Sequence, residues 1–574
     1  MSDGPAVDPI TLEVTRHATA AVCEEMNATL VRTSYSPNIK ERRDCSCALF
    51  DAGGRMVAQA ENIPVHLGSM PASVQAALDR HPPATLAPGD AILLNDPYEG
   101  GAHLPDLTLV TPVFDGDQLV ALTANRAHHA DVGGTQAGSV AADTTEIYQE
   151  GLRIPPVKLH DAGTPVQSVF ELLETNTRTP TERRGDLRAQ LAANETGRRR
   201  YTDLLAREGA AALERALEAL LDYAERRMRA AIAELPDGEY RFADALDDDG
   251  AGTTDLSIAV ALTVDGETLT VDFAGTTDQT RGPLNAVRAV TASATYYAVR
   301  CVTDPSIPPN AGCYRPITIE TPTGSLLDPE PPAAVVGGNL ETSQRVADVV
   351  FGAFAKAIPE TVAAGSQGTM NSITFGGIDP RSESPYAFYE TQAGGFGGRA
   401  GADGMDGVHV HMSNTLNTPV EVLETAYPLR VEQYGLRADS AGAGEYRGGL
   451  GVRRDITVRE HEARFSVLAD RQTSQPYGLS GGEPGAPGRV FRQAPDGETE
   501  RLPGKSTHSL VPGTTVSLRT PGGGGFGAPA DRSREAIARD IQRGVLTVQA
   551  ARERYGDAAV AAALGTSGEP SEDP

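Results

Sequence analysis

Two short polar clusters in the first quarter of the chain contain residue types that could bind a metal ion. The first holds His103 and Asp106, and the second holds His128, His129 and Asp131. Imidazole and carboxylate groups form a mixed nitrogen and oxygen ligand set that suits Zn, Mn or Fe. Two imidazoles and one carboxylate would leave positions open for water or substrate, and such a metal lowers the pKa of a bound water toward ~7.

The segment between the clusters predicts a β-hairpin that would bring them together. Two apolar stretches, 107–114 and 118–125, flank Asp115-Gly116-Asp117, and Asp-Gly is a strong turn signal. Counting outward with a three-residue loop gives the expected pairs Phe114–Gln118, Asp106–Arg126 and Leu104–His128. A slip of one residue would leave both clusters at the open end of the hairpin.

His103 and Asp106 would point to opposite faces of a straight strand, because they are three residues apart. Pro105 and the preceding Gly100-Gly101 allow a turn that brings both side chains to one side. The alternative is a buried polar cluster that only pins the hairpin end, and for a single histidine that interpretation is the better one. Three histidines and two aspartates meeting at one hairpin end favour a metal site.

Glycine-rich motifs elsewhere do not predict a nucleotide site. Gly522–Gly527 fits G-x-G-x-x-G, but Ala528-Pro529 follows it instead of a βαβ unit, so we expect a backbone loop packed against another segment. The chain contains no G-x-x-x-x-G-K-[ST] sequence and no G-x-S-x-G elbow. Gly394–Gly398 precedes His409 and His411, which would share one side of a strand; a ligand site and a tight turn with surface histidines are equally good interpretations.

The composition is acidic, with a net charge of -27 over 574 residues and only four lysines. A dispersed acidic surface argues against nonspecific nucleic-acid binding, which needs a basic footprint. It fits adaptation to high salt, where the charge is screened. No stretch reaches the ~20 apolar residues that span a bilayer, and the N-terminus lacks signal-peptide character, so we expect a cytoplasmic protein.

The five cysteines form no C-x-x-C pair, and we expect them to be small buried hydrophobic residues in a reducing compartment rather than metal ligands.

Apolar periodicity predicts a mixed α+β chain of several domains, with antiparallel hairpins, a helical segment in the middle and a Gly-rich β section near the C-terminus. Helices are expected over 10–31, 69–80, 184–234 (one long helix or a helical hairpin), 285–303, 342–357 and 531–555. Strands are expected over 46–49, 55–59, 91–94, 256–262, 269–273 and 317–319. The expected domains are 1–235 with the metal site, 236–364, 365–530, and a terminal part 531–574 whose tail, 567–574, is expected to be disordered.

Several longer motifs resemble the hydantoinase B/oxoprolinase family, over roughly residues 6–556. They are Arg32–Ser36 with Ile39–Asp44, His66–Met70, Asn95–Tyr98 with Gly101–Asp106, Ala127–Gly134, Glu150–Leu152, Asp406–His409, Asn414–Pro419, Glu421–Glu424 and Pro521–Gly527. The family includes B subunits of N-methylhydantoinases and the corresponding subunit of acetone carboxylases.

The resemblance implies a metal on His103, Asp106 and His128, manganese as in the carboxylase relatives, with Zn or Fe as alternatives. It also implies a separate A-type subunit that holds ATP and Mg, since this chain lacks the half that single-chain oxoprolinases carry. ATP would phosphorylate the oxygen of a cyclic amide, and water would then attack the activated carbon. His129 and Asp131 are the candidates for orienting groups or proton transfer.

Two alternatives to a hydrolase that opens hydantoin or 5-oxoproline rings remain. One is an ATP-dependent ketone carboxylase with the same metal site. The other is a noncatalytic scaffold for the A-type subunit, against which the intact ligand set argues.

Overall fold

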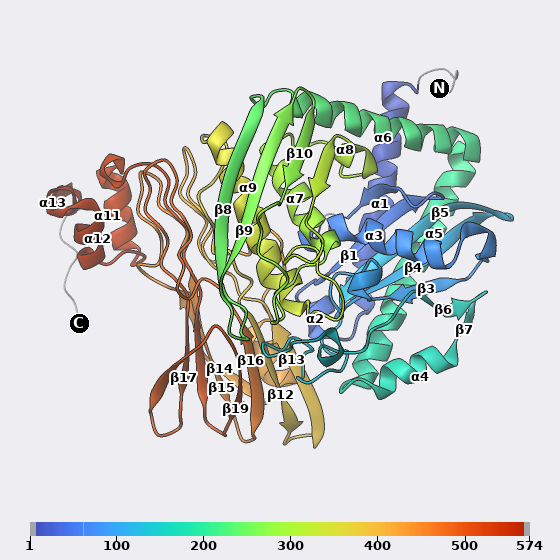
Figure 1. Ribbon diagram of the computed structural model, residues 1–574. Coiled ribbons are helices and arrows are strands. Elements are labelled where there is room, and N and C mark those ends of the chain that lie inside the picture. The colour runs from blue at the N-terminus through green and yellow to red at the C-terminus, as the bar shows by residue number, and fades with distance from the viewer. Residues whose placement is uncertain (1–6, 61, 567–574) are drawn as a thin grey trace.

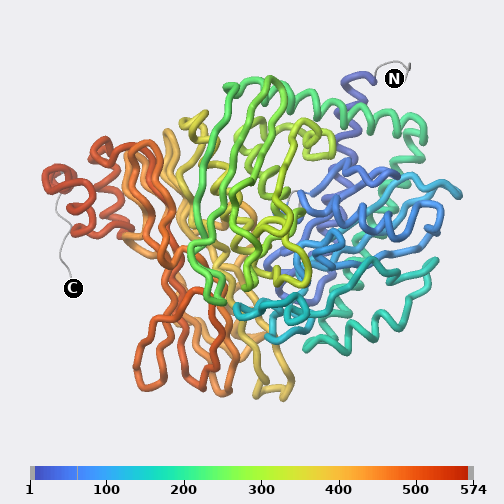
Figure 2. Tube along the Cα trace, in the orientation of Figure 1, coloured from blue at the N-terminus to red at the C-terminus, as the bar shows by residue number. Residues whose placement is uncertain are grey.

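The computed structural model describes residues 7–60 and 62–566, and the polar tail expected at 567–574 lies outside them. These residues form a mixed α+β structure, as the sequence predicts, with four open sheets (Figure 1). The two described ends lie at opposite sides of the molecule, with α1 at one and α13 at the other (Figure 2). Within the described residues, no helix combines the length and apolar character needed to cross a membrane.

A seven-stranded antiparallel sheet holds the polar clusters, in the order β2-β1-β5-β4-β3-β6-β7. Its strands are β1 (Cys45–Asp51), β2 (Met56–Gln59), β3 (Ala91–Leu94), β4 (Asp106–Asp115), β5 (Gln118–His128), β6 (Val157–Asp161) and β7 (Thr164–Pro165). The central strands β1, β4 and β5 are buried on both faces, because helices cover both sides of the sheet.

Helices α1 (Pro9–Thr33) and α5 (Pro180–Glu208) cover one face of this sheet, where Val22 and Met26 pack with Cys45 and Cys47. Helix α3 (Pro64–Arg80) covers the other face. The helices α2 (Pro37–Lys40), α4 (Gln167–Thr175) and α6 (Ala210–Ile232) complete this part. The predicted helical segment is thus two helices, since Gly209 at φ +82° ends α5 and begins α6.

A four-stranded sheet follows, in the order β11-β10-β9-β8, with β10 and β11 parallel. Its strands are β8 (Gly238–Asp248), β9 (Thr254–Asp265), β10 (Thr268–Asp272) and β11 (Ile317–Glu320). Helices α7 (Arg288–Val302) and α9 (Ser343–Ala357) lie between this sheet and α3, and α8 spans Ala311–Tyr314. A π-helix, η4 (Gly338–Thr342), runs directly into α9.

The Gly-rich section forms two antiparallel sheets, β13-β12-β16-β19 and β14-β15-β20-β17-β18. The strands are β12 (Ser372–Asp379), β13 (Ser384–Glu390), β14 (Leu429–Leu436), β15 (Val452–Val458), β16 (Ala463–Leu468), β17 (Arg489–Gln493), β18 (Thr499–Leu502), β19 (Lys505–Leu510) and β20 (Thr515–Arg519), with α10 at Val420–Ala426. The expected close packing of the Gly522–Gly527 loop is confirmed, because a Cβ at Gly523 would lie 2.1 Å from the carbonyl oxygen of Phe396.

Two predictions about elements and cysteines are wrong. The helix expected over 531–555 is interrupted: α11 (Arg534–Gln542) ends before Gly544, and α12 (Val548–Tyr555) and α13 (Asp557–Thr566) follow it. Gly544 at φ +68° breaks the helical path that the apolar spacing alone would continue. Four of the five cysteines are buried as expected, but Cys301 is exposed.

Candidate metal centre

The hairpin predicted from the sequence is the β4–β5 pair, but its register differs from the expected one. Asp106 lies directly opposite His128, not Arg126. The turn is two residues long, Gly116-Asp117, and a bulge interrupts the register between Val113 and Phe114. The shorter turn and the bulge each shift the strand pairing by one residue. Because side chains alternate with a period of two, the net shift of two residues keeps them on the expected faces of the sheet. Asp106 and His128 thereby become direct cross-strand neighbours.

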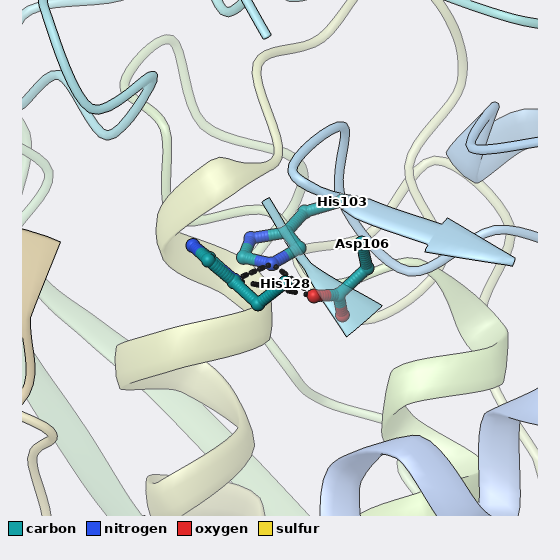
Figure 3. Close-up of side chains that lie close together, drawn as sticks. All are labelled: His103, Asp106 and His128. Atoms are coloured by element: carbon teal, nitrogen blue, oxygen red, sulfur yellow. Dashed lines mark hydrogen bonds and ion pairs between the residues drawn. The ribbon is translucent and has the colours of Figure 1, made fainter. Parts of the chain in front are cut away.

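His103, Asp106 and His128 come together at the open end of this hairpin (Figure 3). The Oδ1 atom of Asp106 lies 3.1 Å from Nε2 of His103 and 3.2 Å from Nδ1 of His128. The two ring nitrogens are 3.2 Å apart. All three residues are buried, so this cluster, the metal-site triad, is closed to bulk water.

A tight turn before β4 places His103 beside Asp106, as the sequence predicts. The amide of Asp106 donates to the carbonyl of His103 at 3.0 Å. The Asn95 amide group donates to the carbonyl of Leu104 at 2.7 Å, which anchors this turn. Gly101 permits the path, because a Cβ there would lie 2.4 Å from the Asn95 carbonyl oxygen.

The electrostatics of the triad favour an ionised carboxylate at Asp106 and a neutral imidazole at His128. Burial alone would raise the pKa of the Asp106 carboxyl, but the adjacent His103 and His66 imidazoles hold that pKa well below its usual range. Burial lowers the pKa of His128 and so favours its neutral, metal-binding form.

His66 is a neighbour of the triad that spacing arguments did not identify. It lies on α3, and its Nε2 atom is 3.3 Å from Oδ2 of Asp106 and 3.9 Å from Oδ1 of Asp44. The residue belongs to a motif already noted for the family resemblance. Nothing in its local pattern indicates that α3 would place it against the end of β4.

Two contacts from distant segments hold the histidines in orientation. Nδ1 of His103 lies 3.4 Å from the carbonyl oxygen of Val336. The Glu150 carboxyl accepts hydrogen bonds from the amides of Val335 and Val336 at 2.9 and 3.0 Å, which fixes that carbonyl. The ring of Tyr389, at the end of β13, stacks on His128.

His129 and Asp131 lie beside the metal-site triad in sequence but form no hydrogen bond or ion pair with it among the described residues. His129 Nε2 pairs with Gln190 Oε1 at 2.9 Å, and burial lowers the pKa of His129 to about 3. Asp131 forms an ion pair with Arg178 at 2.8 Å and accepts the amides of Gly133 and Gly138. These contacts order the loop that follows β5.

His409 and His411 do not share one side of a strand, so that expectation is wrong. Residues 409–411 are outside regular structure, and His411 adopts φ +46°. The imidazole of His409 pairs with Ser413, whereas that of His411 pairs with Asp348 on α9. The left-handed residue turns the second side chain away from the first.

The spacing of the triad fits a divalent metal. Its three facing atoms are separated by 3.1–3.2 Å. Ligands about 2.1–2.2 Å from one ion would be about 3.0–3.1 Å apart at neighbouring octahedral positions and about 3.4 Å apart in a tetrahedral site. Two histidines and one carboxylate on one side of an ion leave its other positions for water or substrate.

The sequence profile described as Hydantoinase B/oxoprolinase matches residues 8–529. The chain belongs to the hydantoinase B/oxoprolinase family. A protein from a Pseudomonas species, named for the B subunit of a D-/L-hydantoinase, is 35% identical, over 97% of this chain and 96% of the relative. This hydantoinase B-type chain is also 37% identical to 5-oxoprolinase 1 of Arabidopsis thaliana, with 91% of the chain matching 42% of that longer protein.

The same hydantoinase B-type fold occurs in a solved structure. The ATP-dependent caprolactamase from Pseudomonas jessenii superposes with a TM-score of 0.89, at 32% identity and with 96% of each chain covered. The family resemblance read from the sequence motifs is therefore confirmed.

Proposed function

We propose that this chain is the B subunit of an ATP-dependent cyclic amidohydrolase that opens hydantoin or lactam rings. The observation that carries the proposal is the buried metal-site triad, in a chain similar throughout to a hydantoinase component and to a caprolactamase. Residues His103, Asp106 and His128 would hold the ion, with manganese preferred and zinc or iron as alternatives.

The bound ion would supply a Lewis acid and an acidified water in a site closed to solvent. Asp106 contributes negative charge, and its position is fixed by His103, His128 and His66. The carbonyl of Val336 orients His103 and so directs its Nε2 atom toward the triad.

We assign orienting roles to His129 and Asp131 rather than contact with substrate. Asp131, through Arg178, holds the loop after β5, and His129 ties the end of β5 to Gln190 on α5. Both residues therefore stabilise the backbone that carries His128.

A separate A-type subunit would bind ATP and Mg and activate the amide oxygen by phosphorylation. More than half of the plant 5-oxoprolinase lies outside the region that matches this chain. The Pseudomonas relative is named for one component of a hydantoinase, which supports a hetero-oligomer as well.

The test is co-purification with an A-type subunit followed by assays with hydantoin, 5-oxoproline, ε-caprolactam and acetone with bicarbonate. We expect the complex to couple ATP hydrolysis to the ring opening of a cyclic amide. We expect Asp106→Asn to abolish the ring opening. Carboxylation of acetone would replace the proposal with a carboxylase, and full turnover by Asp106→Asn would favour a scaffold role.

A further inference from the structure

A second pocket, distinct from the metal-site triad, lies between α7, α9 and the Gly-rich section. Its volume is about 330 Å³, and aromatic side chains form much of its wall: Tyr297, Phe351, Phe396 and Tyr477. Small-molecule sites are typically mostly apolar cavities of roughly 300–1,000 Å³ with a few polar groups. This pocket is therefore large enough for a small ring compound.

A buried histidine–carboxylate pair borders the pocket. Nε2 of His411 lies 3.0 Å from Oδ1 of Asp348, and both residues are buried. When the imidazole is neutral, its Nε2–H donates to the carboxylate and Nδ1 becomes an acceptor. This Nδ1 atom is buried and has no hydrogen-bond partner among the described residues.

The surroundings hold His411 in an unusual conformation. Its ring centroid lies 5.2 Å from that of Phe351, 5.8 Å from Phe396 and 5.9 Å from Tyr297. Its backbone is left-handed, at φ +46°, which is rare for a residue other than glycine and recurs at functional sites. The preceding carbonyl, of Val410, is fixed by a 3.0 Å hydrogen bond from Gln344 on α9.

The charges beside this pair are balanced. Arg471 lies 2.6 Å from Asp244 Oδ2 and 3.4 Å from Asp348 Oδ2, so its guanidinium is already paired. The wall around His411 therefore offers flat apolar surfaces and one unused acceptor. Arg399 and Asp403 also line the pocket, and Asp403 is paired with Arg532.

We infer that this pocket binds a small ring carrying an N–H group, of the cyclic amide class. The ring faces pack between the aromatic side chains, and the N–H donates to Nδ1 of His411. The choice of ligand class rests on the proposed function, whereas the pocket and its histidine–carboxylate pair do not depend on that function.

Cys301 gives a direct readout, because it borders the pocket and is the only exposed cysteine of the five. Although the residue is partly exposed, the thiol itself is shielded from water, which raises its pKa, so alkylation with iodoacetamide is best followed at about pH 9 by peptide mass spectrometry. We expect ε-caprolactam or 2-pyrrolidone, at about ten times its Kd, to slow labelling roughly tenfold in metal-free protein without ATP. No protection at any soluble concentration would overturn the inference.

Three variants locate the binding. His411→Asn removes the imidazole while tolerating the positive φ, and it should abolish most of the protection. His508→Asn, which changes a histidine on β19 that pairs with Ser506, should leave the protection intact. Asp106→Asn should also leave it intact, since the metal-site triad is elsewhere. Protection that survives in His411→Asn, or disappears in Asp106→Asn, would place the ring outside this pocket and overturn the inference.

The labelling assay needs no metal, ATP or partner subunit. A lack of protection would therefore count against this pocket, whereas a lack of ATP-dependent turnover would count against the proposed function.

Discussion

The ring of Tyr389 stacks on the imidazole of His128, with centroids 4.6 Å apart and planes inclined by 15°. The guanidinium of Arg42 lies 5.0 Å from the same tyrosine ring and donates to the Tyr389 carbonyl oxygen at 3.0 Å. A strand from the Gly-rich section thus fixes the plane of a side chain at the end of β5, more than two hundred residues earlier in the chain.

This stacking predicts that Tyr389→Leu weakens metal binding by roughly tenfold or more, the effect typical of losing a group that orients a ligand. Tyr389→Phe keeps the ring and should bind metal nearly as wild type does. Metal titration and the visible absorption spectrum of the cobalt-substituted protein measure the effect. Equal affinities and spectra for the Leu and Phe variants would contradict an orienting role for the ring.

Asp106→Asn should reduce the metal content to well below one ion per chain, because it removes the only carboxylate of the triad while keeping its shape. We expect turnover with the A-type partner to fall by orders of magnitude. The melting temperature of the metal-free protein should fall while the fold survives, since Asp106 pairs with three buried histidines but the large core does not depend on this one carboxylate. Elemental analysis, thermal melts and coupled turnover test this, with His508→Asn as the control. Normal metal content in the Asn variant would remove Asp106 from the site.

We expect the buried carboxyl of Glu341 to make the folded protein less stable as the pH rises. Burial raises the pKa of this carboxyl to about 8 in the folded chain, from its ordinary value of 4.5. Between these values the folded state keeps a proton that the unfolded state releases, so the free energy of unfolding falls with rising pH, by up to roughly 5 kcal/mol. Below about pH 4.5 both states are protonated and the penalty vanishes.

Glu341→Gln should abolish this part of the pH dependence, because the amide keeps an acceptor for the hydrogen bonds from Met370 and Thr369. Urea unfolding of both proteins at about pH 6 and about pH 8.5 provides the comparison. We expect the variant to gain stability relative to wild type at the higher pH. A difference that does not grow with pH would mean that Glu341 is ionised in the folded chain.

The net charge of -27 predicts that salt stabilises the protein. Repulsion among the excess carboxylates opposes the compact state, and screening reduces it. The melting temperature should therefore rise from dilute buffer to molar KCl, and NaCl should act similarly because screening depends on ionic strength. A flat or falling curve in both salts would show that the acidic composition is not an adaptation to salt.

Local patterns in the sequence were enough to predict the β4–β5 hairpin and the meeting of His103, Asp106 and His128. Two apolar stretches and an Asp-Gly turn are short-range signals that do not depend on distant segments of the chain. Even here the register was wrong, because the bulge between Val113 and Phe114 responds to packing on both faces of the sheet.

The tertiary structure alone decided what surrounds this cluster. His66 reaches it from α3, Val336 from the segment before η4 and Tyr389 from β13, and no local spacing relates these residues to one another. The pairing of His411 with Asp348 likewise depends on α9 packing beside a left-handed backbone turn. Contacts between residues so far apart in the chain form only when the helices and sheets bury their apolar faces together. The sequence therefore determines these contacts, but no local pattern in it reveals them.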